Sequence, residues 1–200
     1  MKTYVVVITG ASGSVYGLRL VEQLLAAGAS VTLIVTKAGR EVMQFETGFS
    51  LPGEGTGAED ALLRFLELPP TAALRVVSQD DLFDASASGS ARIDGVIVCP
   101  ASMGFCGSVA AGLASDLPER AADVMLKERR PLILVPRETP FSLVHLRNLT
   151  ALAEAGAIIV PPSPAFYHKP TSIDDLVDFV VGKVLDQLGV EHRLFARWGE

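Results

Sequence analysis

YVVVITGASGSVYG, residues 4–17, is the stretch that decides the fold of this chain. It begins with a mostly β-branched apolar run without polar interruption, which is typical of a parallel strand buried on both faces. Small residues and glycines follow, and the helical spacing of valine and leucine begins directly after them. The pattern predicts a strand, a tight turn and a helix whose N-terminal amides point into the turn. Such amides bind anions, so a phosphate is the expected occupant.

The turn has an alternative interpretation, a tight strand-to-helix connection that binds nothing. If a ligand is bound, the second strand indicates which one. A dinucleotide fold places a carboxylate at the end of that strand to hold the ribose. Here the second apolar run, residues 31–35, ends in Thr36 and Lys37. The glycines of the turn also depart by one residue from the NAD-type spacing, so the sequence favours a mononucleotide such as FMN over NAD.

The composition favours a single domain over residues 1–200. Of the 200 residues, 49% are hydrophobic, which is enough for one well-buried core. The net charge of −6 argues against nucleic acid or an anionic membrane as the main partner. Only 20% of the residues are charged, so part of the surface is expected to be covered in a homo-oligomer. The aromatic tail, residues 189–200 with Trp198, is expected to dock on a neighbouring subunit.

Membrane and metal sites are both disfavoured. No run reaches about 18 apolar residues, and the N-terminal segment lacks a secretory layout, which indicates a cytoplasmic protein with no membrane partner. Cys99 and Cys106 are the only cysteines, and two thiols without a cluster of histidines do not indicate a metal site. Buried free thiols are expected instead of a disulfide.

Five further apolar runs alternate with helical patterns. They cover residues 31–35, 75–78, 95–99, 131–135 and 157–160. The alternation predicts a single Rossmann-like α/β fold, a doubly wound parallel sheet of about six strands with helices on both faces. In this fold the first and fourth strands are neighbours where the winding reverses, and ligands bind at their carboxyl ends.

Several segments are expected near that crevice. Residues 100–104 form a second turn of small residues after the fourth strand, and residues 136–140 follow the fifth. Residues 79–92 show no period and many small residues, which predicts that residues 86–90 form a mobile loop that covers a ligand. Glu46 lies near the C-terminal end of a predicted helix, where the dipole disfavours a carboxylate. It is either an ordinary exposed residue or is placed there for a purpose.

Motifs along nearly the whole chain resemble those of one family. They are TGASGSVYGLRL at 9–20, ERAADVMLKERRPLILVPRETPFS at 119–142, PAFYHKP at 164–170, SIDDLVDFVV at 172–181 and FARWGE at 195–200. With these motifs the chain resembles the flavin prenyltransferases of the UbiX type, within the flavin-binding cysteine decarboxylase-like flavoproteins. Decarboxylases of that group rely on a catalytic histidine and a Met-Asn motif, and this sequence shows no counterpart of either.

The resemblance implies a metal-independent transfer of a dimethylallyl group from dimethylallyl phosphate to reduced FMN. The prenyl chain would join N5 and then C6 of the flavin, and the prenylated FMN would serve a UbiD-type decarboxylase. The resemblance also implies a dodecamer. Two alternatives stay open at this point: an FMN-dependent decarboxylase of the same fold, and a flavin carrier without chemistry.

The resemblance also implies roles for individual residues. Ser12 would hydrogen-bond near N5, while Glu46 and Glu138 would position the flavin and manage protons. The flavin-binding positions are Gly10, Ala11, Ser12, Thr36, Ser102, Met103, Gly104, Phe105 and Arg137. The residues that match the family's phosphate set for the prenyl donor are Lys127, Arg137, Tyr167 and Lys183.

Four positions depart from the family pattern. Ala101 stands where the family usually has Cys, and Gly104 and Phe105 replace more polar residues. Backbone contacts to the flavin would survive these changes. Lys183 replaces a frequent Arg, which keeps the charge but loses the bidentate fork.

Overall fold

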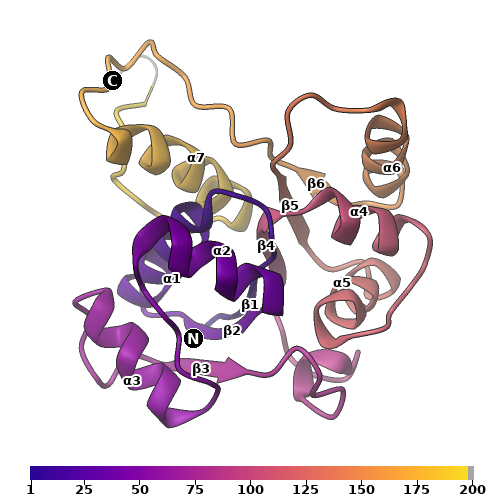
Figure 1. Cartoon of the computed structure of the whole chain (residues 1–200), viewed down its shortest axis with the longest axis horizontal. Helices are drawn as coiled ribbons and strands as arrows, with labels where there is room; N and C mark the ends of the chain where they lie inside the picture. Colours follow the sequence, from indigo (N-terminus) through magenta and orange to yellow (C-terminus); the bar gives the residue numbers. More distant parts are fainter. Residues whose placement is uncertain (198–200) are drawn as a thin grey trace.

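A computed structural model describes residues 1–197 of the chain, and within this range six strands form one parallel sheet (Figure 1). The spatial order is β3-β2-β1-β4-β5-β6. This order is that of a doubly wound fold whose winding reverses between β1 and β4, which confirms the predicted fold class. The strands are β1 (Thr3–Ile8), β2 (Ser30–Val35), β3 (Leu74–Val77), β4 (Gly95–Ala101), β5 (Leu132–Pro136) and β6 (Ile158–Ile159).

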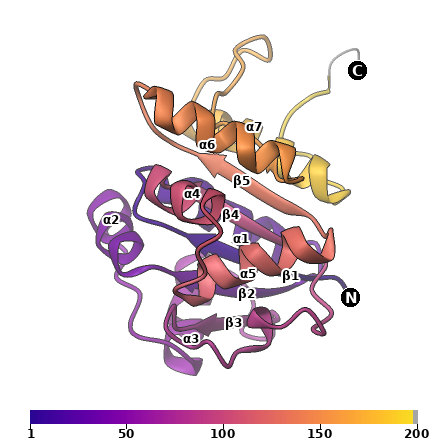
Figure 2. The ribbon, with the colours of Figure 1, turned by 90° about the vertical axis from the view of Figure 1, so that its right-hand side faces the viewer.

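Helices cover both faces of the sheet (Figures 1 and 2). The helices on one face are α1 (Ser14–Ala26), α2 (Lys37–Thr47), α3 (Thr56–Phe65) and α7 (Ile173–Leu188). Those on the other are α4 (Met103–Ala110), α5 (Leu117–Glu128) and α6 (Leu143–Glu154). Within the described residues, no helix has the length and apolar character needed to cross a membrane.

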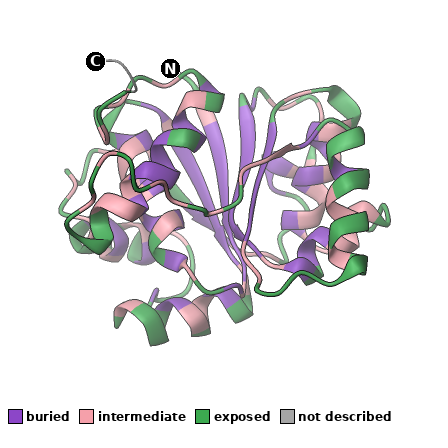
Figure 3. Ribbon diagram, turned by 90° about the horizontal axis from the view of Figure 1, so that it is seen from above, coloured by how far each residue is buried: buried purple, intermediate pink, exposed green. Residues whose placement is uncertain are grey.

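The core consists of two apolar layers that share the strands. In β1, Tyr4, Val6 and Ile8 pack under α1, α3 and α7, whereas Val5 and Val7 pack under α4 and α5. Strands β4 and β5 alternate between the layers in the same way. Figure 3 shows the buried strands between the two sets of helices. Burial on both faces explains why the strands are continuous apolar runs in the sequence.

Close packing of α1 on the sheet depends on a glycine. A Cβ built on Gly17 would collide with the carbonyl oxygen of Cys99 and would lie 2.8 Å from Ile8 Cγ1. The helix therefore lies against the ends of β1 and β4, which places its N-terminus at their carboxyl edge. Cys99 and Cys106 are buried free thiols, as predicted, and burial raises the pKa of Cys106 to about 12.

The predicted loop at residues 86–90 does not line the crevice cavity of its own chain, so that prediction is wrong. Residues Ala85–Ala87 form a short 3₁₀ helix that packs against α5. The Arg120 side chain donates to the carbonyl of Ala87 at 3.1 Å, and Arg130 donates to Gly89 at 2.7 Å. Arginine side chains thus tie the segment along α5, an interaction that the lack of periodicity did not reveal.

The described part of the tail packs on its own chain. A Cβ at Gly182 of α7 would collide with Phe195 and lie 2.7 Å from His192 Cε1, so the missing side chain makes room for these two rings. Docking on a neighbouring subunit, expected for residues 189–200, stays a prediction, and Trp198 lies outside the described residues.

Candidate active site

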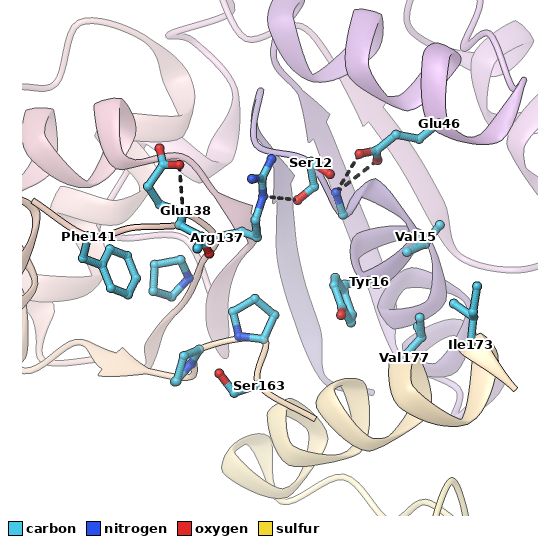
Figure 4. Close-up of a pocket in the computed structure, with 15 residues that line it drawn as sticks. Ser12, Val15, Tyr16, Glu46, Arg137, Glu138, Phe141, Ser163, Ile173 and Val177 are labelled. Atoms are coloured by element: carbon cyan, nitrogen blue, oxygen red, sulfur yellow. Dashed lines mark hydrogen bonds between the residues drawn. The ribbon is translucent and has the colours of Figure 1, made fainter. Parts of the chain in front are cut away.

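A cavity of about 470 Å³ opens at the carboxyl ends of β1 and β5. It lies where the fold predicts a ligand crevice. Ser12, Glu46, Arg137 and Glu138 supply its polar groups (Figure 4). An apolar wall completes it, formed by Val15, Tyr16, Phe141, Ile173, Val177 and the prolines at 136, 161 and 162. The cavity can therefore hold a flat or branched apolar group beside charged residues.

The turns after β1 and β4 are locked together by Thr9. Its hydroxyl donates to the carbonyl of Pro100 at 2.8 Å and accepts from the backbone amide of Ser102 at 2.7 Å. On its other side the first turn touches α2, because a Cβ at Gly10 would lie 2.7 Å from Ala38 Cβ. Gly10 and Ala11 thus lie between the N-termini of α2 and α4. This role of Thr9 was not predicted from the sequence, although its position directly after β1 could have indicated it.

Glu46 caps the N-terminus of α1. Its carboxylate accepts from the amides of Gly13 and Ser14, at 3.0 and 2.9 Å, and from the Ser14 hydroxyl at 2.6 Å. Gly13 has a φ of 102°, and no side chain of its own caps the helix. The expectation that a phosphate occupies these amides is therefore wrong. A carboxylate from the end of α2 already uses the anion site.

The pKa of Glu46 lies below its ordinary value of 4.5. Partial burial alone would raise it, but hydrogen bonds from the hydroxyls of Ser12 and Ser14 and from the amides of Ser14 and Gly13 together outweigh that effect. Glu46 is thus held as a carboxylate that accepts hydrogen bonds. This geometry fits a positioning role for Glu46 and links it directly to Ser12.

Arg137 and Glu138 both line the cavity, because the chain leaves β5 in an irregular turn. The strand ends at Pro136, and the Arg137 amide still donates to Ala101 at 3.1 Å. The Arg137 side chain crosses to the first turn and donates to the Ser12 carbonyl at 3.0 Å. The Glu138 side chain points away from that of Arg137 (Figure 4). Its carboxylate accepts from the Thr139 amide at 3.0 Å.

The turn before α4 offers backbone donors. The Ser102 hydroxyl accepts from the Phe105 amide at 3.2 Å. Among the described residues, nothing accepts from the amides of Met103 and Gly104, which belong to the unsatisfied first turn of the helix. The side chains of Met103 and Phe105 lie in the core, and a Cβ at Gly104 would meet only the Ser102 hydroxyl, at 4.0 Å. The family departures at Gly104 and Phe105 therefore leave these donors available.

Thr36 lies at the N-terminus of α2, as Ser102 does at the N-terminus of α4. Its hydroxyl accepts from the Gly39 amide at 3.0 Å and caps the helix. The amide of Lys37 donates to the Gln79 side chain at 2.7 Å. Thr36 therefore borders the first turn but does not line the cavity.

The predicted phosphate set is not assembled within one chain, since only Arg137 lines the cavity. Tyr167 lies edge-on to Phe179, with ring centroids 5.9 Å apart. Lys183 pairs with Asp186 on α7, about 15 Å along the helix from its start. Lys127 pairs with Glu128 at the end of α5, which leads into the amino end of β5 and so lies at the opposite edge of the sheet.

The apolar wall was not predicted from the sequence. Its members come from α1, from the end of β5 and the loop after it, from the loop after β6 and from the first turns of α7. No single segment of the sequence therefore indicates the wall. The exposure of Ile173, 76%, is the unusual feature, and it is visible only in the folded chain. Partial burial raises the pKa of Tyr16, so its phenol stays protonated. Among residues 1–197, no three His, Cys, Asp or Glu side chains gather as a metal site.

Comparison with known proteins gives a consistent result. The model of the Flavoprotein family matches residues 1–185. The chain is 45% identical over 193 residues to the flavin prenyltransferase UbiX of Pseudomonas aeruginosa, a match that covers 96% of this chain and 92% of the relative.

Two solved structures have the same fold over their full length. One is AnUbiX in complex with FMN and dimethylallyl pyrophosphate, with a TM-score of 0.88 and 37% identity, covering 100% of this chain and 98% of that one. The other is a dodecameric FMN-dependent UbiX-like decarboxylase of Escherichia coli, with a TM-score of 0.86 and 38% identity, covering both chains completely.

Proposed function

Since the chain belongs to the Flavoprotein family and, within it, to the UbiX-type flavin prenyltransferases, we propose that its crevice transfers a dimethylallyl group from dimethylallyl phosphate to reduced FMN. The new bonds form at N5 and C6 of the flavin. One observation carries the proposal: the cavity places Ser12, Arg137 and Glu138 beside an apolar wall. The phosphate of the donor requires the polar and charged side chains, and its allyl group requires the apolar wall.

The residues present fit FMN. The amides of Met103 and Gly104 supply donors at the positive end of α4, which suits the FMN phosphate. Gly10 and Ala11 lie between Thr36, at the start of α2, and Ser102, at the start of α4. All four residues would therefore border one bound FMN. Ser12 and Arg137, which line the cavity, would hold the flavin ring, and the Ser12 hydroxyl would be its hydrogen-bonding partner near N5. Bound reduced FMN supplies the nucleophilic nitrogen and carbon.

Fixed cations replace a metal in this proposal. Ionisation of an allylic phosphate requires positive charge around the departing oxygens, and preorganised cations act strongly in a water-poor site. Arg137 provides one such charge within the chain. Tyr167, Lys183 and Lys127 complete the set from neighbouring subunits, because none of the three lines the cavity of its own chain. Lys127 in particular lies at the far edge of its own sheet.

Proton transfer is divided between the two glutamates. Glu138 lines the cavity and serves as the base that removes the C6 proton during ring closure. Glu46 stays ionised and orients the Ser12 hydroxyl, so it positions the flavin and holds the proton of that hydroxyl.

A homo-oligomer follows from the same geometry, and we propose a dodecamer like that of the E. coli relative. Helix α6 leaves Leu143, Val144 and Leu146 exposed, which a single chain cannot cover. The prenylated FMN is passed to a UbiD-type decarboxylase. A cytoplasmic place of action is part of this proposal and rests on the sequence alone.

Reconstitution tests the activity. Protein freed of flavin, given FMN, a reductant and dimethylallyl phosphate, should convert the flavin to a prenylated product of higher mass, with inorganic phosphate released in equal amount. A carrier would bind FMN and leave both substrates unchanged. A decarboxylase would instead release CO₂ from a carboxylic acid without consuming the prenyl donor.

Mixed oligomers test the shared site. Lys127→Ala and Arg137→Ala should each be inactive alone. If Lys127 acts in a neighbour's crevice, random mixing restores about a quarter of the sites, because each site needs one intact residue from each of two chains. If both residues act in one chain, mixing restores no activity.

A further inference from the structure

The apolar end of the cavity borders a second, charged cavity. Val15, Ile173 and Val177 lie together on the side away from Glu138 and Phe141 (Figure 4). The same three residues line a neighbouring cavity of about 330 Å³ between α1 and α7. These three side chains, called the lip here, line both cavities and so lie between the apolar cavity and the second one.

Charged groups line the outer cavity beyond this lip. Arg19 donates to both carboxylate oxygens of Asp178, at 2.7 and 3.1 Å, and to Glu22 at 2.6 Å. Asp174, from the first turn of α7, lines the same cavity. Their contact with water is substantial, since the Arg19 side chain is 31% exposed. A hydrocarbon group placed there would remove that water without offering a hydrogen bond.

Resting on the proposed function, we infer that the lip of Val15, Ile173 and Val177 and the ion cluster of Arg19, Glu22 and Asp178 limit the prenyl donor to one isoprene unit. A five-carbon chain ends inside the apolar cavity. A ten-carbon chain with the same phosphate must pass the lip, and its second isoprene unit then desolvates the ion cluster. The site selects against longer donors through charge as well as through size.

The expected preference for dimethylallyl phosphate over a longer donor can be expressed as a ratio of kcat/KM values. A misplaced methylene in an enzyme pocket commonly changes kcat/KM by about 10–200-fold. Geranyl phosphate adds a whole isoprene unit, so wild-type enzyme should prefer dimethylallyl phosphate by at least about 100-fold.

Two variants test the lip and the cluster separately. Ile173→Ala opens the lip at an exposed position of the first helical turn, where the fold has little to lose. Arg19→Met combined with Asp178→Leu removes the Arg19–Asp178 pair together, and Glu22, which also pairs with Arg19, keeps its contact with water. Leu176→Ala is the matched control, because Leu176 lies on the same helix but lines neither cavity.

The readout is the ratio of kcat/KM for dimethylallyl phosphate to that for geranyl phosphate, per folded protein. Both test variants should lower the ratio by about tenfold or more, and the control should leave it unchanged. Equal use of the two donors by wild-type enzyme would overturn the inference. So would an unchanged ratio in Ile173→Ala, even if the double variant fails to fold. Failure of the proposed function itself is distinct, since wild-type enzyme would then not consume dimethylallyl phosphate at all.

Discussion

Replacing Glu46 with glutamine should destabilise the protein through one helix terminus. The carboxylate accepts from the amides of Gly13 and Ser14 and from the Ser14 hydroxyl. A glutamine of the same shape has one carbonyl oxygen for these donors, and its NH₂ group faces the remaining amide. The first turn of α1 therefore loses an acceptor and the negative charge that complements its dipole.

The expected cost is about 1–2 kcal/mol of unfolding free energy. Loss of a helix-capping side chain costs about 0.5–2 kcal/mol, and a charge at a helix terminus contributes about 0.3–1 kcal/mol. The side chain lies at the surface, where solvent screens part of the charge, so these effects sum to less than their maxima. Glu41→Gln on the same helix is the control, because Glu41 is exposed and its substitution removes the same charge.

The cost should depend on pH with a defined sign. The folded pKa of Glu46 is lower than its ordinary 4.5, so its carboxylate stabilises the fold fully above pH 4.5. This stabilisation is lost as the pH falls through the folded pKa. The deficit of Glu46→Gln relative to wild type should be largest at pH 7 and should shrink below pH 4.5.

Urea unfolding of wild type and both variants, at pH 7 and at the lowest pH where wild type stays folded, measures these differences. The reasoning is refuted if Glu46→Gln loses no more stability at pH 7 than Glu41→Gln. It is also refuted if the deficit is the same at both pH values.

Two further predictions concern packing and chemistry. Gly17→Ala should cost about 3 kcal/mol, because its Cβ would collide with the backbone oxygen of Cys99; Gly57→Ala, with nothing within 4 Å, should be neutral or stabilising by about 0.5 kcal/mol. A Gly17→Ala protein that melts like wild type would contradict the close packing of α1. Glu138→Gln should bind FMN and dimethylallyl phosphate normally but close the new ring about 10²–10³-fold more slowly. A wild-type rate of ring closure, measured in single turnover per folded protein, would remove Glu138 from the mechanism.

The architecture could be predicted from the sequence because its signals are local. Apolar runs such as Tyr4–Ile8 and residues 131–135 report burial on both faces, and the small residues at 9–13 and 100–104 report turns into helices. Those patterns are sufficient to predict the order of the central strands and the position of the crevice. The motif residues Ser12, Arg137 and Glu138, which line one cavity, follow directly from that order, since each lies at the carboxyl end of a strand.

Other features depended on contacts between distant segments. The position of Glu46 at a helix C-terminus looked unfavourable, and only the fold shows that the carboxylate faces the N-terminus of α1. The basic motif around Lys127 looked like part of the same crevice, yet it lies at the other edge of the sheet. The lip at Ile173 likewise exists only where α1 meets α7. Periodicity and turn chemistry act over a few residues, whereas the field at a carboxylate and the shape of a cavity are set by side chains that only the folded chain brings together.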